Sequence, residues 1–250
     1  MVVDLIQPEL PKRLSKSAIR KVAAYRLMVS RAIVSGLKQI AQNDRPPLLN
    51  VSGVDDLDPD ATGQISHRSA LAGKLKGFAH IGVPVRQLLE HSGLPTVYGY
   101  LGTVYGPGKA FAAAVIPGIV RHTMPVIGNG SNHIALIHVE DAARAIVHIG
   151  ENLGEIAPGS TWVICDGTAT TQAEFMDGMA ALLHAEKPRR IPCWLASLVA
   201  GKIMTEVLSR ETRCEISALR ATGFRLRYPG WQTGVPQMLK ALGYSGREQK

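Results

Sequence analysis

Side chains that could carry out acid/base or anion-binding chemistry are spread over the whole chain. His80 is an imidazole, which can give or accept a proton near neutral pH, although a lone histidine can equally be an ordinary packed residue. Four arginines in the last quarter of the chain could hold a phosphate through paired N–H donors or could simply be solvated. They are Arg210, Arg213, Arg225 and Arg227. Cys165, Cys193 and Cys214 lack the spacing of metal ligands, so the sequence predicts no metal site.

The elements that must position such side chains are clearest between residues 124 and 149. A turn cluster at residues 128–130 precedes an apolar run at 134–139, which has the length of a strand. Apolar residues then recur at helical spacing; they are Ala142, Ala145, Ile146 and Ile149. Asp141 stands where a carboxylate would cap the helix and meet its dipole. The stretch therefore predicts a turn, a strand and a helix capped by Asp141.

The first 52 residues predict a strand, a long helix and a second strand. Residues 2–6 are β-branched or apolar apart from Asp4, and residues 47–52 form a second, largely apolar run. Between them, residues 17–42 show one apolar face, and the cations Lys21, Arg26, Arg31 and Lys38 fall mostly on the other, solvent-facing side. Such an order is typical of a parallel crossover unit. Later, Thr171 and Glu174 make a capping box at the start of another helix.

Two motifs resemble the extended short-chain dehydrogenase/reductase family, the NAD-dependent epimerases and dehydratases. One is His-Val-Glu-Asp-Ala-Ala at residues 138–143, and the other is Gly-Thr-Val-Tyr-Gly-Pro-Gly at residues 102–108. The resemblance covers nearly the whole chain, as the later two thirds of a family member. It implies an α/β fold, with a truncated Rossmann-like parallel sheet and a small C-terminal substrate lobe.

The resemblance implies NAD or NADP as cofactor. It places Leu101, Gly102, Thr103 and Val104 beside the nicotinamide. A glycine-rich turn between a strand and a helix normally cradles the dinucleotide diphosphate, and no glycine of this chain stands in that pattern. Two expectations follow: either a segment upstream of Met1 supplies the turn, or the chain does not hold a dinucleotide in the usual way.

The family's acid/base residues are a Tyr and a Lys four positions later, with a Ser or Thr upstream. Ser52 matches the position of that serine. The helix at residues 77–92 matches the one that carries the pair, but neither possible alignment supplies a phenol or an amine. The aligned residues are Phe78 and Gly82, or Gly77 and Ile81. His80 lies between these positions and is the alternative acid/base group, so the predicted catalytic residues are Ser52 and His80.

The resemblance also suggests residues for the substrate, which in the family is often a nucleotide-linked sugar. Asn132 and His133 fall where members read that substrate, and Arg213 and Arg225 are candidates for its phosphate. We expect a small-molecule partner of this kind, with a homodimer as a possible assembly because helix-paired dimers are common in the family.

Composition narrows the class of protein further. The net charge is +8, with the positive excess in residues 1–48 and 185–250, but aromatic residues make up only 5% and no recognised nucleic-acid module appears. No apolar run approaches the roughly 20 residues needed to span a bilayer. Asp4 and Pro8 interrupt the apolar core that a signal peptide would need. We expect a cytoplasmic protein with neither a membrane nor a nucleic acid as partner.

We expect a partial Rossmann domain at residues 1–108, followed at 109–250 by the rest of the sheet and the substrate lobe. Three functional hypotheses remain. The first is an NAD(P)-dependent epimerase, dehydratase or reductase acting on a nucleotide-sugar-like substrate, truncated or catalytically impaired. The second is a non-catalytic relative that binds a ligand or a protein. The third is a basic nucleic-acid-associated protein, which the low aromatic content disfavours.

Overall fold

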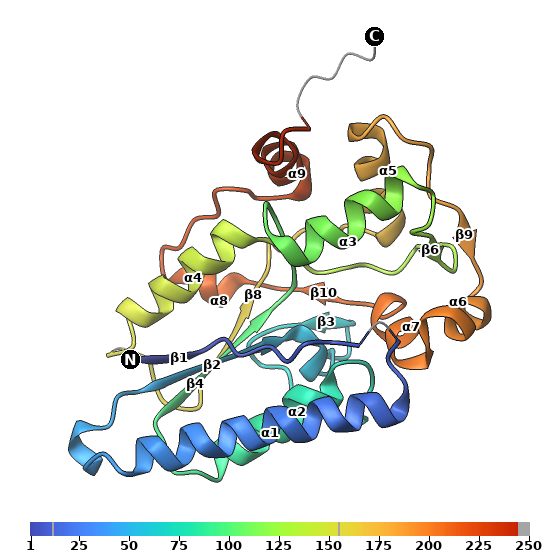
Figure 1. Ribbon diagram of the computed structural model, residues 1–250. Coiled ribbons are helices and arrows are strands. Elements are labelled where there is room, and N and C mark those ends of the chain that lie inside the picture. The colour runs from blue at the N-terminus through green and yellow to red at the C-terminus, as the bar shows by residue number, and fades with distance from the viewer. Residues whose placement is uncertain (12, 155, 245–250) are drawn as a thin grey trace.

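A parallel sheet of four strands forms the centre of the molecule, which is a computed structural model that describes residues 1–11, 13–154 and 156–244. The strand order is β1 (Val2–Asp4), β2 (Leu48–Gly53), β4 (Thr96–Leu101) and β8 (Thr161–Ile164). All three pairings are parallel. Figure 1 shows these strands between helices below and above them. The α/β fold with a Rossmann-like parallel sheet, predicted from the sequence, is confirmed.

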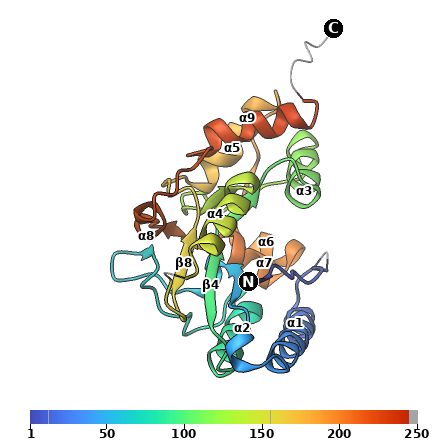
Figure 2. The same cartoon turned by 90° about the vertical axis from the view of Figure 1, so that its left-hand side faces the viewer.

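Helices cover both faces of the sheet, as Figure 2 shows from the side. On one face lie α1 (Lys16–Lys38) and α2 (Ala79–Glu90), whose apolar residues pack with Tyr98 and Tyr100 of β4. On the other face lie α4 (Val139–Glu151) and α8 (Ser217–Ala221), which pack against Leu49, Val97 and Ile164. Burial on both faces explains why β2 reads as an almost unbroken apolar run.

A second core lies above the sheet in Figure 1. Helices α3 (Lys109–Val120), α5 (Gln172–Leu182) and α9 (Trp231–Ala241) surround it, with Phe175, Met179 and Val235 among its buried side chains. Two small parallel sheets join this lobe to the rest. They pair β5 (Thr103–Tyr105) with β7 (Leu136–His138), and β6 (Val126–Ile127) with β9 (Arg190–Ile191).

The remaining elements gather at the carboxyl end of the sheet. They are the short helices α6 (Cys193–Ala200) and α7 (Lys202–Leu208), strands β3 (Gln64–Ile65) and β10 (Arg213–Cys214), and the 3₁₀ turn η2 (Val54–Asp56) that directly follows β2. A further 3₁₀ turn, η1 (Gln42–Asp44), precedes β2. Strands β3 and β10 pair in parallel, so two segments far apart in the sequence meet here.

A buried ion pair fixes α1 on the sheet. Arg26 Nη2 lies 2.6 Å from Asp4 Oδ2, and Arg26 Nη1 donates to Ser30 Oγ at 2.6 Å. Asn50 of the neighbouring strand donates to the same Asp4 oxygen at 3.2 Å. The prediction that Arg26 belongs to the solvent-facing side of the helix is therefore wrong, because its guanidinium compensates a buried carboxylate.

The helix caps agree only partly with the sequence. Thr171 and Glu174 form the predicted capping box at the start of α5. At α4 the cap is His138, whose Nδ1 accepts from the Glu140 amide at 3.2 Å. Asp141 lies in the first turn of the helix, fully buried, and accepts from the amides of Arg227 and Tyr228 at 2.8 and 2.7 Å. Asp141 therefore anchors the chain before α9 and does not cap α4.

Candidate functional site

Ser52 lies near the carboxyl end of β2 and contacts a buried acid. Its hydroxyl donates to Asp56 Oδ2 at 2.5 Å. The turn η2 brings Asp56 back over the strand end, where only 1% of the residue is exposed. Ser52 is half-buried at the carboxyl end of its strand. In open α/β sheets, ligands bind beyond the carboxyl ends of the strands.

Burial governs the charge of Asp56. It raises the pKa of this carboxyl to about 8, and the nearby Asp55 charge raises it further, whereas the Ser52 hydrogen bond and Arg210 lower it. At neutral pH the Asp56 carboxyl is therefore mostly protonated. Ser52 and Asp56 together hold a proton that can be given up close to pH 8, which is the range useful for general acid/base chemistry.

Helix α2 makes room for this acid by having no side chain at residue 82. A Cβ atom at Gly82 would lie 1.8 Å from Asp56 Oδ2. Phe78, four residues earlier, packs instead against the apolar cluster of Leu14, Ile19 and Ile203. In the alignment that places Phe78 and Gly82 at the family's Tyr and Lys positions, these positions are occupied by an apolar ring and by a glycine against which Asp56 packs.

His80 lies in the first turn of α2 and is half-buried. Within the part of the chain that the structure describes, the His80 ring makes no hydrogen bond. Its predicted acid/base role stays a prediction.

A cavity of about 780 Å³ opens beside Asp55, the neighbour of Asp56 in the chain. One wall is formed by Asp55, Asp58 and Pro59 together with Gly73, Lys74, Lys76 and Gly77, and the other by the end of α7 with residues 209–211. Arg210 holds the two walls together, because its Nη1 donates to the Asp55 carbonyl at 2.5 Å and its Nη2 to the Leu57 carbonyl. Burial raises the pKa of Asp55, and the Arg210 charge opposes that rise. Arg210, a candidate phosphate ligand by sequence, is thus a structural clamp.

Two lysines lie at the cavity, whose lining also contains the carboxylates Asp55, Asp58, Glu206 and Glu211. Lys74 and Lys76 line it, and both are exposed. Within residues 1–11, 13–154 and 156–244, neither lysine takes part in an ion pair. Of the lining carboxylates, Asp58 accepts from the Gly73 amide at 2.8 Å and Glu206 from the Gly77 amide at 3.2 Å. The lysines are therefore the groups placed to meet an anionic ligand.

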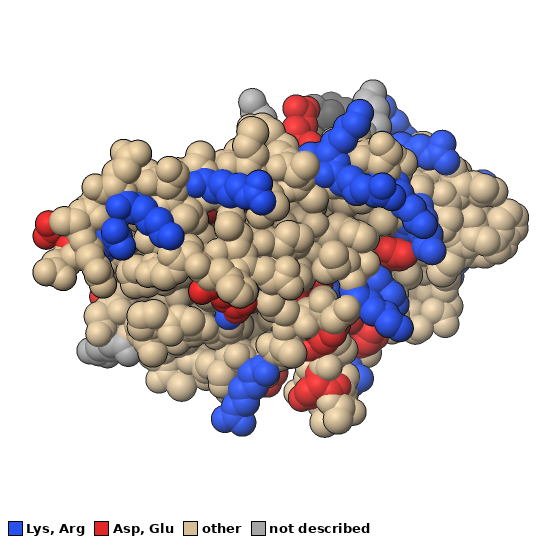
Figure 3. All heavy atoms as spheres, turned by 90° about the horizontal axis from the view of Figure 1, so that it is seen from below, with Lys and Arg blue, Asp and Glu red and all other residues tan. Residues whose placement is uncertain are grey.

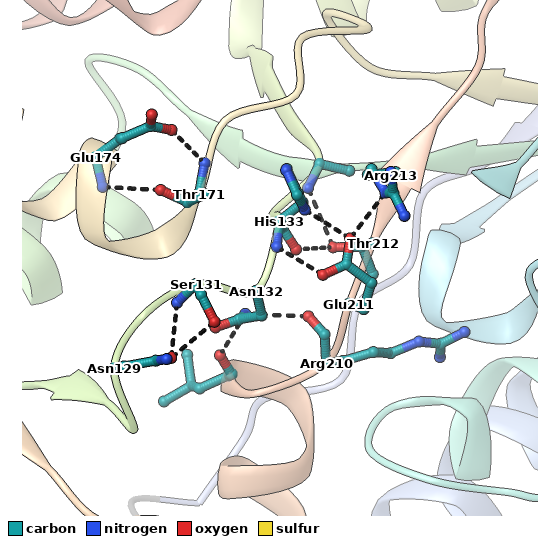
Figure 4. A network of polar contacts seen from close by, with 12 residues as sticks. Asn129, Ser131, Asn132, His133, Thr171, Glu174, Arg210, Glu211, Thr212 and Arg213 are labelled. Atoms are coloured by element: carbon teal, nitrogen blue, oxygen red, sulfur yellow. Dashed lines mark hydrogen bonds and ion pairs between the residues drawn. The ribbon is translucent and has the colours of Figure 1, made fainter. Parts of the chain in front are cut away.

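Three of the four predicted substrate residues meet around Glu211, as Figure 4 shows. The Asn132 amide donates to the carbonyls of Leu208 and Arg210 at 3.2 and 3.1 Å. His133 Nδ1 lies 2.7 Å from Glu211 Oε1, and Arg213 Nε donates to the same oxygen at 3.1 Å. Glu211 lines the cavity. These contacts tie the turn before β7 to the cavity wall, so Asn132, His133 and Arg213 position the site.

Arg225 does not join this group. It is exposed and follows Phe224, which is buried in the core on the α4 face of the sheet. Figure 2 shows α8 and α7 on opposite sides of the sheet. A sequence resemblance locates a residue along the chain but does not say which face of the sheet it reaches.

The predicted nicotinamide contacts are only partly available. The amides of Gly102 and Thr103 donate to the carbonyls of Ile164 and Ala135 at 3.0 and 2.7 Å. Gly102 is glycine because a Cβ there would lie 2.9 Å from the Ala135 carbonyl oxygen. Leu101 and Val104 are half-buried, and Thr103 has an exposed side chain. Thr103 and Ser52 both carry hydroxyls that are not fully buried, and α2 contains no lysine.

Asp56 is the candidate site residue that the sequence analysis did not identify. Its signal is present in the sequence, as a carboxylate four positions after a serine that ends an apolar run. Asp55 and Asp58 flank it, however, and read together they indicate a solvated loop. Among the described residues, no group of three or more His, Cys, Asp or Glu side chains is arranged to hold a metal ion.

Comparison with known proteins agrees with this architecture. Residues 85–165 match the model of the NAD dependent epimerase/dehydratase family. A 3-diazoavenalumate denitrifying reductase from a Streptomyces species is 24% identical over 92% of this chain and 75% of its own length. None of the described helices has the length and hydrophobicity to cross a membrane.

Two solved structures share the fold. Human epimerase family protein SDR39U1 (isoform 2) with NADPH has a TM-score of 0.81 at 18% identity, covering 95% of this chain and 81% of that one. MoeE5 in complex with UDP-glucuronic acid and NAD has a TM-score of 0.68 at 17% identity, covering 96% and 78%. The resemblance to the NAD-dependent epimerase/dehydratase family that the two sequence motifs predict is thereby confirmed.

Proposed function

We propose that the chain is a nicotinamide-nucleotide-dependent enzyme of the epimerase, dehydratase or reductase type, in which Ser52 and Asp56 replace the usual Tyr–Lys pair. The observation that carries the proposal is the 2.5 Å hydrogen bond between the Ser52 hydroxyl and the buried Asp56 carboxyl at the ligand-binding edge of the sheet. NAD and NADPH accompany solved proteins of the same fold. Titration with NADH and NADPH distinguishes the two nucleotides.

In this mechanism Ser52 is the residue that touches the substrate. Its hydroxyl donates a proton to a substrate oxygen and receives one from Asp56, which is mostly neutral at pH 7. For the reverse direction, Ser52 accepts the substrate proton and passes one to the Asp56 carboxylate. A bound nicotinamide would supply or accept the hydride. Asp56 itself has no direct access to the substrate, since it is buried. It acts by orienting the Ser52 hydroxyl and by returning a proton to it.

We further propose that the substrate is a small anionic molecule of the nucleotide-sugar class, bound between residues 55–77 and the C-terminal lobe. Lys74 and Lys76 supply the positive charge at the cavity. Figure 3 shows the face covered by α1 and α2, where Lys and Arg gather toward the end at which α1 begins. α7 packs on that same end through Ile203. The ammonium groups of Lys74 and Lys76 would pair with the phosphates of such a substrate.

Binding of NADH and NADPH, followed by fluorescence, tests the cofactor, and turnover of UDP-sugars tests the reaction. With Asp56→Asn we expect cofactor binding to be unchanged and kcat to fall by roughly 100-fold or more, as is usual on losing a general acid. Lys74→Ala combined with Lys76→Ala should raise KM with little change in kcat. Absence of saturable nicotinamide-nucleotide binding to the wild-type protein would reject the proposal.

One observation favours a second candidate, a non-catalytic protein that binds a nucleotide-type ligand. The Asp56 carboxyl fills the space beside Gly82, which is the position of the family's lysine in one of the two possible alignments. This candidate predicts that UDP-sugars bind and that Lys74→Ala weakens them, while neither NADH nor NADPH binds. The same titrations therefore separate the two functions.

A further inference from the structure

Helix α6 presents apolar side chains to solvent. Among the residues that the structure describes, the three most exposed large hydrophobic side chains all belong to this helix. Trp194, Leu198 and Val199 are 66%, 64% and 73% exposed, and α6 carries no charged residue. Its other side is held in the fold, because Ala196 is 2% exposed. Removing the three side chains from water would be favourable, so the outer face of α6 is suited to an apolar environment outside the chain.

The segment that contains α6 is basic. Residues 187–205 include four Lys or Arg and no Asp or Glu. Lys187 and Arg189 are exposed shortly before the helix, and within the described parts of the chain neither takes part in an ion pair. Arg190 pairs with Asp177 at 3.2 Å. Lys187 and Arg189 are therefore cations that remain available to a partner of α6.

A second basic segment, the start of α1, lies beside α6. Residues 10–43 contain no Asp or Glu. Gly201 joins α6 to α7, and a Cβ atom there would lie 2.8 Å from the Leu14 carbonyl oxygen and 3.6 Å from Arg13 Cγ. Arg13 and Lys16 are exposed. In Figure 3 the right-hand end of the molecule, where α6 lies in Figure 1, projects in tan, with Lys and Arg gathered beside it. An uncharged projection thus has cations from two segments next to it.

We propose that α6 docks on an anionic lipid surface, with its three exposed apolar side chains in the outer apolar layer and the neighbouring cations against the headgroup phosphates. Trp is favoured at membrane interfaces, and helices that combine Trp and Leu with adjacent Lys and Arg lie in that layer. Charge complementarity selects this partner, because a second copy of the chain would bring like charges together. A docked peptide would need a groove, whereas Figure 3 shows a projection.

The proposed contact is peripheral, because a helix of eight residues is far too short to cross a bilayer. The expectation from the sequence that no membrane is a partner rests on the search for a spanning segment and a signal peptide. Neither criterion tests a short helix that lies on the lipid surface. The proposal therefore replaces that expectation for this one face of the molecule.

Sedimentation with vesicles tests the docking. The whole chain is mixed with vesicles of phosphatidylcholine alone, or of phosphatidylcholine and phosphatidylserine, at low and high salt. We expect the chain to sediment with the mixed vesicles, and less so at high salt because salt screens the cations. Lys187→Ala combined with Arg189→Ala should weaken binding by roughly 10-fold or more, since each cation near an anionic surface adds to the affinity. Failure of the wild-type chain to bind the mixed vesicles would reject the proposal.

Two double variants test the apolar contact. Leu198→Ser combined with Val199→Ser should abolish sedimentation with the mixed vesicles. The matched control is Tyr25→Ser combined with Met28→Ser, because these side chains are 53% and 57% exposed on α1 and should not touch the lipid. Equal effects of the two double variants would overturn the proposal. So would a wild-type dimer that does not bind vesicles and that the Leu198 and Val199 changes dissociate, since α6 would then be a contact between two copies of the chain.

Tryptophan fluorescence locates the contact. The chain has three tryptophans, and the indole nitrogens of Trp162 and Trp231 are buried, so Trp194 is the one most accessible to acrylamide. Binding to the mixed vesicles should shift the emission to shorter wavelength and protect Trp194 from quenching. Trp194→Phe should lose both signals and still sediment. Unchanged quenching in the bound wild-type chain would show that α6 does not face the lipid. Neither readout needs catalysis or a nicotinamide nucleotide, so both are independent of the function proposed above.

Discussion

The carboxyl group of Asp56 lies against the backbone of Gly82, so closely that a Cβ at residue 82 would come within 1.8 Å of Asp56 Oδ2. The acid and the helix therefore fit only because residue 82 has no side chain. Both residues are buried, so neither can move away without opening the core.

Gly82→Ala tests this fit. We expect a loss of stability of about 1–3 kcal/mol, as for other overpacked cores, measured by urea unfolding. Gly36→Ala is the matched control, because Gly36 is an exposed residue of α1 and a Cβ added there would have no other atom within 4 Å. It should stabilise the protein by up to about 1 kcal/mol through helix propensity. Similar effects at both sites would contradict the close contact.

The protonated state of Asp56 predicts a dependence of stability on pH. Its pKa is raised from 3.8 to about 8 on folding, so between these values the folded chain binds a proton that the unfolded chain releases. The free energy of unfolding should therefore fall as the pH rises from about 4 to about 8, by a few kcal/mol. Asp56→Asn should lack this component, so at pH 8 the variant should be the more stable protein. Parallel curves for the two proteins would contradict the raised pKa.

The buried pair of Asp4 and Arg26 should be sensitive to losing one partner. Arg26→Leu leaves an uncompensated carboxylate in the core, which typically costs about 3–5 kcal/mol. Arg227→Leu is the control, since its ion pair with Glu140 is exposed and such pairs contribute about 0–1 kcal/mol. Urea unfolding of both variants at one pH makes the comparison. Equal losses would mean that the Asp4 site is hydrated.

Glu211 and His133 should show coupled effects at the cavity wall. In a double-mutant cycle with Glu211→Ala and His133→Ala, we expect a coupling free energy of about 0.5–1 kcal/mol, because the two side chains meet directly but are partly solvated. Stability is the measured quantity. Additive effects would show that the contact contributes nothing to fixing the wall.

Features set by neighbours in the sequence could be predicted well. The capping box of Thr171 and Glu174 depends on residues three positions apart, and the crossover of β1, α1 and β2 follows from apolar periodicity. The same local reasoning predicts Asp141 as a helix cap. That prediction is wrong, because the partners of Asp141 are the amides of residues 227 and 228, which lie far along the chain.

The site itself was harder to predict, for the same reason. Asn132, His133 and Arg213 do meet, but their polar groups bind Glu211 and backbone carbonyls, which no spacing pattern reveals. The importance of Asp56 arises from its burial against α2, a tertiary effect that outweighs the solvated-loop character of its neighbours. The domain division at residues 108 and 109 and the catalytic roles of Ser52 and His80 stay predictions.

The pairing of β3 with β10 also has a consequence for folding order. β10 follows the cavity-lining residues 209–211, and its pairing with β3 closes a loop that spans most of the chain. Long loops are entropically costly to close before other contacts form, so this pairing should appear after the central sheet has assembled. Amide hydrogens of Ile65 and Glu215 should accordingly exchange with solvent sooner than those of β2, which would make this strand pair less protected than the central sheet.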